Sequence, residues 1–122
     1  MDRSETARRG EDAAAAYLER IGMTIENRNW RCAAGEIDIV AMDDGVTVFV
    51  EVKTRRSERA GTADEAVSPA KQKRVARLAG VYLRSAGAPE DTSARFDVVA
   101  IHVLSPDRAL LRHHRGAFDL PS

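Results

Sequence analysis

The apolar residues of this chain recur with two different periods, which predict helices and strands respectively. A helical period runs through residues 4–21, which Gly22 is suited to end, and through residues 69–87, which open with Ser68 as N-cap and Pro69 in the first turn. Alternating or apolar runs predict strands over residues 23–30, 35–42, 46–53, 94–104 and, with the weakest pattern, 108–118. The consecutive strands favour an antiparallel meander, and the later strand–helix–strand unit favours a parallel crossover. The predicted fold is therefore a mixed α/β sheet with helices packed on it.

A tight turn at Asp44-Gly45 would set the register between the second and third strands. In a two-residue type I′ hairpin Asp43 faces Val46, and further along the pair Asp38 faces Glu51. The same register gives an apolar face of Ile37, Ile39 and Ala41 with Val52, Val50 and Val48, and on the other face it sets Glu36 opposite Lys53. A slip of one residue would bring the charges into the apolar face, so the pattern itself favours this register.

Two carboxylates facing one another across a strand pair are unfavourable for folding. Asp38 and Glu51 would lie about 5 Å apart at Cβ, where an effective dielectric near 20 makes their repulsion cost about 3 kcal/mol. A divalent cation would turn the repelling pair into a pair of ligands. Lys53, on the same face, would then orient a water molecule, as metal-assisted phosphodiester hydrolysis requires. The alternative interpretation is a half-solvated strand face, which shows the same alternation.

Composition is typical of a single cytoplasmic domain over residues 1–122. The chain is long enough for its own core, and 43% of its residues are hydrophobic. Cys32 is the only cysteine, which excludes an intrachain disulfide or a cysteine metal cluster and favours a reducing compartment. The charged N-terminus predicts no secretory signal, and no apolar run approaches the ~20 residues of a membrane span.

Positive charge is concentrated in the middle of a chain whose net charge is zero. Residues 1–50 carry a net charge of −4, residues 51–84 of +5 and residues 85–122 of −1. Residues 54–67 have no consistent period and predict a mobile surface loop. Basic residues at the start of this loop and on the second helix are candidate nucleic-acid contacts: Arg55, Arg56, Lys71, Lys73, Arg74 and Arg77. A solvated helix face is the alternative for the helical ones.

Three short motifs, taken in this order, resemble a known family. They are GEIDIVA at 35–41, VFVEVKTR at 48–55 and RFDVV at 95–99. Together they resemble the YraN-like family of uncharacterised bacterial proteins, which is similar to the PD-(D/E)xK nuclease superfamily and, within it, to the archaeal Holliday-junction resolvases. The resemblance covers nearly the whole chain and implies a restriction-endonuclease-like fold, with a helix–three strands–helix–strand core.

The resemblance also implies roles for individual residues. Asp38, Glu51 and the backbone carbonyl of Val52 would hold Mg²⁺ or Mn²⁺, and Lys53 would position the attacking water. Glu11 matches an acid on the first helix that often joins such sites, and its spacing places it on the apolar side of that helix; an exposed first-turn acid is the alternative. Because resolvases are dimers, the resemblance suggests a homodimer.

Three functions are compatible with the sequence. The leading hypothesis is a metal-dependent nuclease that acts on DNA, branched or structured DNA in particular. The second is a nucleic-acid-binding or DNA-processing accessory module that keeps the fold without turnover. The third is an interaction protein that binds no nucleic acid, which the net charge of zero permits.

Overall fold

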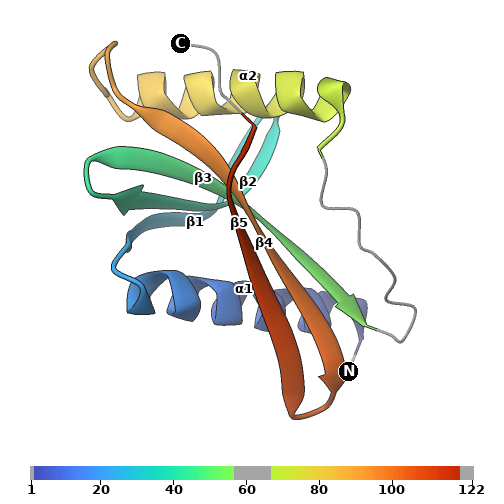
Figure 1. The fold of residues 1–122 in the computed structure, drawn as a ribbon. Coiled ribbons are helices and arrows are strands. Elements are labelled where there is room, and N and C mark those ends of the chain that lie inside the picture. The colour runs from blue at the N-terminus through green and yellow to red at the C-terminus, as the bar shows by residue number, and fades with distance from the viewer. Residues whose placement is uncertain (1, 57–66, 119–122) are drawn as a thin grey trace.

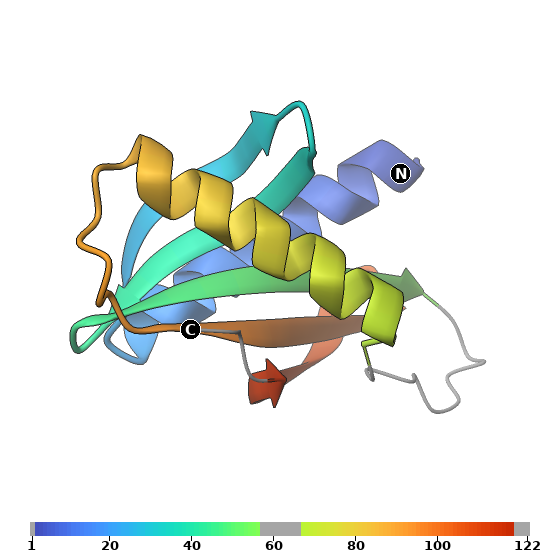
Figure 2. The same cartoon turned by 90° about the horizontal axis from the view of Figure 1, so that it is seen from above.

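The computed structural model describes residues 2–56 and 67–118 of the chain. In chain order it contains α1 (Arg3–Arg20), β1 (Thr24–Cys32), β2 (Gly35–Asp43), β3 (Val46–Arg56), α2 (Pro69–Ser85), β4 (Ala94–Ser105) and β5 (Arg108–Phe118). The described strands form one sheet in the order β1-β2-β3-β4-β5. The two helices cover opposite faces of this sheet, which gives three layers (Figure 1, Figure 2).

The strand directions are those expected of a meander followed by a crossover. β1, β2 and β3 pair antiparallel, β3 and β4 pair parallel across α2, and β5 returns antiparallel along β4. The predicted mixed α/β sheet is therefore confirmed. With one helix before the meander and one in the crossover, the arrangement is restriction-endonuclease-like.

Both helices begin at side chains that accept a backbone N–H of the first turn. Asp2 Oδ1 accepts from Glu5 N at 2.8 Å, and Ser68 Oγ accepts from Lys71 N at 3.2 Å. Gly22 follows α1 with a φ of +106°, a conformation that L side chains rarely adopt. No helix in the described ranges is long and apolar enough to cross a membrane.

The β2–β3 hairpin has the predicted turn and register. Asp44 and Gly45 have φ values of +53° and +86°, as a type I′ turn requires, and the pairs run from Asp43–Val46 to Ile39–Val50. β3 then continues to Arg56, three residues into the segment 54–67 that the sequence predicted as a loop. The rest of that loop, residues 57–66, lies outside the described residues.

Each face of the sheet has a separate apolar core. Beneath α1, Leu18 packs with Val48 and Val50, whereas beneath α2 the residues Val40 and Phe49 pack with the apolar side of that helix. Val40 and Phe49 are 0% exposed, although the predicted alternation sets them on the same face as Glu36 and Lys53. Their burial is complete because helices cover the strands on both sides, and a strand covered on both sides is apolar on both sides.

The alternation of side chains along β2 breaks at Asp38. Ile39 packs beneath α1, but Ile37 packs beneath α2, although residues two apart on a regular strand share a face. On the neighbouring β1, Arg28 pairs with Ile39 and Trp30 pairs with Ile37, and Asn29 between them has a φ of +54°. The irregular backbone of β1 thus lies beside the change of face on β2, and the predicted grouping of Ile37 with Ile39 is corrected.

Gly10 allows α1 to lie close to β3. A Cβ atom at this position would be 2.0 Å from Thr54 Oγ1 and 3.1 Å from Thr54 Cβ. Thr54 Cγ2 would be 3.2 Å away as well, so rotating the Thr54 side chain would leave its Cβ atom too close to the new methyl group. The close approach brings the middle of α1, where Glu11 lies, onto the end of β3.

We expect Gly10→Ala to lower the free energy of unfolding by about 1–2 kcal/mol, since overpacking outweighs the gain of about 1 kcal/mol in helix propensity. Urea unfolding followed by circular dichroism measures the change. Gly80→Ala in α2 is the matched control, because there the new Cβ meets only the end of the flexible Arg84 side chain, at 3.2 Å. Adding Thr54→Ala to the Gly10→Ala variant should restore stability. If Gly10→Ala lowers the free energy of unfolding equally with and without Thr54→Ala, the proposed contact is contradicted.

Candidate functional site

Strands β2 and β3 separate where their acidic residues begin. The recorded ladder ends at Ile39 and Val50, and beyond it the Val52 N–H donates to Asp38 Oδ2 at 2.8 Å. The Asp38 side chain thus takes the place of a backbone acceptor. We call the region formed by Asp38, Glu51 and Val52 the fork. Within the described ladder Asp38 and Glu51 are not a facing pair, which corrects the predicted register at this end.

The predicted pairing of Glu36 with Lys53 is also absent from the described ladder. Glu36 instead forms an ion pair with Arg31 of β1, with 3.3 Å between Oε2 and Nε. The cause is the same separation of the two strands, which leaves Glu36 on the β1 side.

Burial and neighbouring acids make the Asp38 carboxyl difficult to ionise. Burial is the largest effect and raises its pKa, the Val52 N–H lowers it, and the negative charges of Glu11, Glu51 and Glu36 raise it further, to about 6 from 3.8. Acids from α1, β2 and β3 therefore act on one carboxyl group. An acid that is costly for folding and open to a hollow is typical of a functional site.

We expect Asp38→Asn to raise the free energy of unfolding by about 2 kcal/mol at pH 7.5 in EDTA, because asparagine can still accept the Val52 N–H without carrying charge. The folded-state pKa is the higher one, so the wild type loses stability as the pH rises from 3.8 through about 6. The difference between variant and wild type should therefore vanish below about pH 4. Urea unfolding at both pH values measures it, with the exposed Asp91→Asn as control. A variant less stable than wild type at pH 7.5 would contradict this account.

Asp38 lines two hollows on opposite sides of the sheet. The hollow on the α2 side has a volume of about 220 Å³ and also contains Glu51, Lys71 and Arg74. The hollow on the α1 side has a volume of about 810 Å³ and is lined by Glu11, Val52 and Arg56 together with the first turns of α1. The fork is thus accessible from both faces, with basic and acidic groups on each.

The ion-pair partner recorded for Glu51 is Lys71 from α2. The Lys71 ammonium contacts Glu51 Oε2, and the two side chains are 31% and 19% exposed. Sequence analysis placed Lys71 among the phosphate contacts, and its pairing with a predicted metal ligand was not foreseen. Lys53 follows Glu51 by two residues on β3, is half-buried and pairs in register with Ala100 of β4.

Glu11 lies in the middle of α1 rather than in its first turn. Its side chain is 18% exposed and lies 4.0 Å from Arg28. Its charge contributes to the raised pKa of Asp38. The alternative of an exposed first-turn acid is therefore wrong, and Glu11 belongs to the surroundings of the fork.

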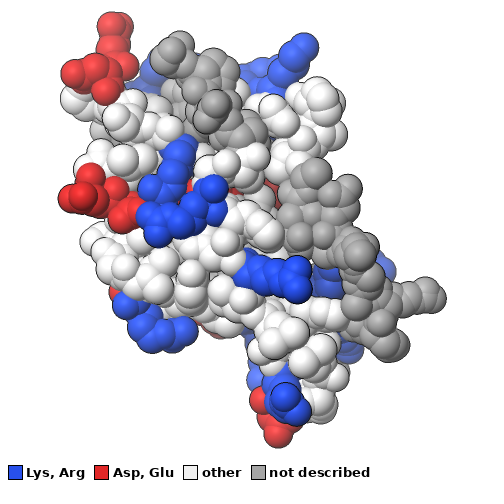
Figure 3. All heavy atoms as spheres, viewed as in Figure 1, with Lys and Arg blue, Asp and Glu red and all other residues white. Residues whose placement is uncertain are grey.

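The remaining basic candidates are distributed around the fork rather than gathered in it. Arg74 lines the α2-side hollow and Arg56 the α1-side hollow, whereas Arg55, Lys73 and Arg77 are exposed and line neither. Figure 3 shows one face of the molecule, on which the Lys and Arg side chains form separate groups rather than one continuous patch. Of the predicted basic contacts, Lys71, Arg74 and Arg56 are thus the ones that border a hollow together with Asp38.

The donor set of the fork is suited to a hard divalent cation. Asp38 and Glu51 offer carboxylate oxygens and Val52 a carbonyl oxygen, and Mg²⁺ or Mn²⁺ prefers such ligands with water in the other positions. Among the described residues, no three His, Cys, Asp or Glu side chains are placed to hold a metal together. A cation at the fork would therefore depend on two carboxylates, one of which is paired with Lys71.

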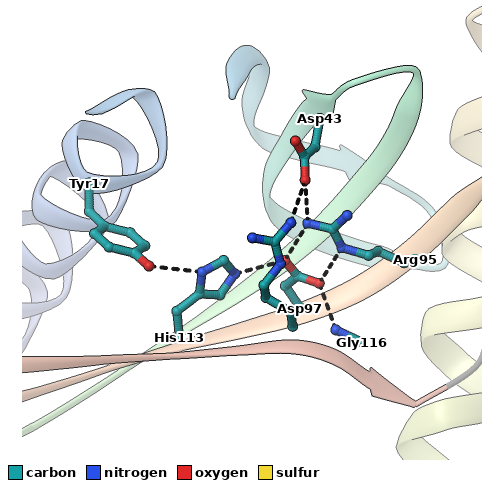
Figure 4. Close-up of polar contacts among 7 residues, drawn as sticks. Tyr17, Asp43, Arg95, Asp97, His113 and Gly116 are labelled. Atoms are coloured by element: carbon teal, nitrogen blue, oxygen red, sulfur yellow. Dashed lines mark hydrogen bonds and ion pairs between the residues drawn. The ribbon is translucent and has the colours of Figure 1, made fainter. Parts of the chain in front are cut away.

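Sequence analysis missed a second polar cluster, centred on Asp97 of β4 (Figure 4). Asp97 is 0% exposed, and its two oxygens contact Arg95 Nε at 3.0 Å, Arg95 Nη2 at 3.2 Å, His113 Nε2 at 2.8 Å and Gly116 N at 2.9 Å. Burial opposes ionisation of Asp97, but the bonds from His113, Arg95 and Gly116 outweigh it and hold its pKa below the usual value. The sequence did contain one signal of this cluster, because Asp97 is the single acid in the otherwise mostly apolar segment RFDVVAI.

The Asp97 cluster joins four elements of the fold. Asp43 Oδ2, at the end of β2, accepts from Arg95 Nη2 and from Arg115 Nη2, each at 2.8 Å. On the other side His113 Nδ1 lies 3.0 Å from the Tyr17 hydroxyl of α1. Because Nε2 of His113 faces the ionised Asp97, it carries the proton, and Nδ1 accepts from Tyr17. The cluster thus ties α1, the hairpin, β4 and β5 together, one strand away from Glu51.

Comparison with known proteins places this chain in a family. The model of the family described as Uncharacterised protein family UPF0102 matches residues 10–101. The chain belongs to this family. A UPF0102 protein of Geobacter sulfurreducens is 51% identical over 112 residues, which are 92% of this chain and 87% of the relative, and one of Symbiobacterium thermophilum is 50% identical over 109 residues, 89% and 92% of the two chains. The YraN-like resemblance is confirmed.

A solved structure also resembles this UPF0102 protein at a distance. It is described as Pyrococcus furiosus SfsA in complex with Ca²⁺, with a TM-score of 0.46 and 13% sequence identity. The match covers 94% of this chain and 64% of that chain.

Proposed function

We propose that this UPF0102 protein is a metal-dependent nuclease that hydrolyses phosphodiester bonds in DNA, with branched or structured DNA as its substrate. The observation that carries the proposal is the position of Asp38, which borders one hollow with Glu51 and the other with Glu11. Burial and the neighbouring acids raise its pKa to about 6, so the ionised form is costly for the folded chain. A divalent cation held by Asp38 and Glu51 would relieve that cost and would supply the Lewis acid that metal-assisted phosphodiester hydrolysis needs.

Asp38 and Glu51 are the side chains that would hold Mg²⁺ or Mn²⁺, together with the Val52 carbonyl. When bound, such a cation polarises the phosphoryl group and lowers the pKa of a bound water. Lys53, two residues after Glu51 on β3, orients the attacking water or neutralises a phosphate oxygen. Glu11 adds negative charge from α1. The role of Lys53 follows from the family resemblance alone, since Lys53 lines neither hollow, whereas Asp38, Glu51, Val52 and Glu11 border the hollows.

The basic groups of the two hollows are suited to the phosphates on either side of the reacting one. Arg74 borders the hollow on the α2 side and Arg56 the hollow on the α1 side, so each would bind a phosphate on its own face of the sheet. The exposed Arg55, Lys73 and Arg77 would add sequence-independent contacts to DNA outside the hollows. A homodimer would present two forks to the two strands of a junction.

A second candidate function is a DNA-binding module without turnover. The ion pair between Lys71 and Glu51 favours it, because this pair already neutralises one of the two carboxylates. In that case the basic residues bind DNA, and the acids at the fork have no chemical role.

Cleavage assays separate the two functions. Labelled four-way junction, flap, single-stranded and duplex DNA are incubated with the pure protein in MnCl₂ or in EDTA, and sedimentation equilibrium gives its oligomeric state. Cleavage in MnCl₂ but not in EDTA would support the nuclease. Salt-dependent binding of junction DNA without cleavage under either condition would favour the binding module, and no binding at low salt would contradict both.

A further inference from the structure

Lys71 neutralises Glu51 from the first turn of α2. The ammonium is paired with Glu51 Oε2 in a contact that is partly shielded from water, since neither side chain is more than 31% exposed. The chain itself thus provides the positive charge at the fork that a bound ion would otherwise supply.

The backbone at Lys71 is fixed, while its side chain is long and flexible. The Lys71 N–H is accepted by Ser68 Oγ, the Gln72 N–H by Ser68 O at 2.9 Å, and the Gln72 side chain donates to Val67 O at 2.9 Å. Val67 is buried in the core beneath α2. The part of Lys71 that can move is therefore its ammonium group, together with the chain of methylenes that carries it.

A lysine in this turn is electrostatically unfavourable unless a carboxylate is near. The N-terminal end of a helix carries partial positive charge and favours acidic residues, yet the first turn of α2 contains none. Both the helix end and Lys71 bring positive charge to Glu51. A metal cation at the Glu51 carboxylate would be repelled by the helix end and by the Lys71 ammonium. Only the ammonium can move away.

From this geometry we infer that Lys71 and a divalent cation compete for the Glu51 carboxylate, so that Lys71 keeps the fork closed to metal until its ammonium moves away. The inference rests on the metal site of the proposed function. Lys71 also lines the α2-side hollow with Arg74, so a phosphate held there would attract the displaced ammonium. Phosphate and cation would then favour each other's binding, because the coupling between two ligands is reciprocal.

Isothermal titration of the full chain with MnCl₂ tests the competition. Lys71→Met should bind Mn²⁺ on the order of tenfold more tightly than wild type. Lys73→Met is the matched control, since it removes the same charge from an exposed position of the same turn, and it should change the affinity by less than about twofold. Saturating MnCl₂ should also raise the melting temperature of Lys71→Met more than that of wild type. If Lys71→Met does not fold, as circular dichroism will show, Lys71→Gln takes its place.

Asp38→Asn distinguishes failure of the competition from failure of the metal site. Equal Mn²⁺ affinities for the Lys71 and Lys73 variants, with binding lost in Asp38→Asn, would overturn the competition and leave the metal site standing. Mn²⁺ binding by Asp38→Asn at the wild-type affinity would overturn the metal site, and the competition with it.

Discussion

Asp97→Asn is expected to lower the free energy of unfolding by about 3–5 kcal/mol, the usual cost of removing one partner from a buried ion pair. Both carboxylate oxygens of Asp97 accept hydrogen bonds inside the protein, from Arg95, His113 and the Gly116 N–H. An asparagine has only one oxygen, so its NH₂ group would face a donor, and Arg95 would lose its buried counter-ion. Urea unfolding at pH 7 measures the loss.

The pH dependence of this loss has a definite sign. The pKa of Asp97 is lower in the folded than in the unfolded chain, so its contribution is present above the usual value of 3.8 and disappears as the pH falls through the folded-state pKa. The difference in the free energy of unfolding between wild type and Asp97→Asn should therefore become smaller as the pH falls. Asp44→Asn, in the exposed turn, is the control and should change stability by less than about 0.5 kcal/mol. A loss below about 1 kcal/mol for Asp97→Asn would mean that the cluster adds little to stability.

Lys53→Met should reduce the single-turnover rate of DNA cleavage by about 10²-fold or more, because positioned proton-transfer and water-orienting groups contribute about 10²–10⁴-fold. Lys53 lies on the same strand as Glu51 and is half-buried, so no solvent ion replaces its charge readily. The Mn²⁺ affinity and the melting temperature should stay near their wild-type values, since Lys53 is neither a ligand nor part of a core. Rapid-quench assays with excess enzyme measure the rate.

The control for Lys53 is Lys73→Met, which removes an identical side chain from an exposed position on α2. It should weaken DNA binding slightly and leave the rate at saturating enzyme unchanged. Cleavage by Lys53→Met at the wild-type rate would exclude Lys53 from the chemistry. Cleavage rates are compared only between wild-type and variant preparations that have the same melting temperature. A loss of folding is then not counted as a loss of catalysis.

Much of the fold could be predicted from local signals in the sequence. The N-cap at Ser68, the turn at Asp44-Gly45 and the two hydrophobic periods fix helix ends, hairpin register and strand directions, because each acts within a few residues. The burial of Phe49 could not be predicted in the same way. It depends on where α2 lies in three dimensions, and the alternation of β3 is compatible with one covered face or with two.

The acidic residues of the candidate site could be predicted from the sequence, but their contacts could not. The motifs identified Asp38, Glu51 and Lys53, whereas the pairing of Glu51 with Lys71 joins residues 20 positions apart across the crossover. The change of face at Asp38 could not be predicted, because Ile37 and Ile39 have the spacing of a regular strand and yet pack on opposite faces of the sheet. The acid at Asp97 gave a usable signal, since a lone carboxylate in an apolar strand must find buried partners.

A β-sheet normally separates the solvent on its two sides as a continuous wall, and at Asp38 this wall has an opening. One carboxyl group borders the hollows on both sides, so its charge contributes to the potential in each of them. A ligand that changed the charge of Asp38 from the α1 side would therefore change the electrostatic potential around Glu51 on the α2 side. Through this one side chain, the electrostatic potentials of the two faces of the sheet depend on each other.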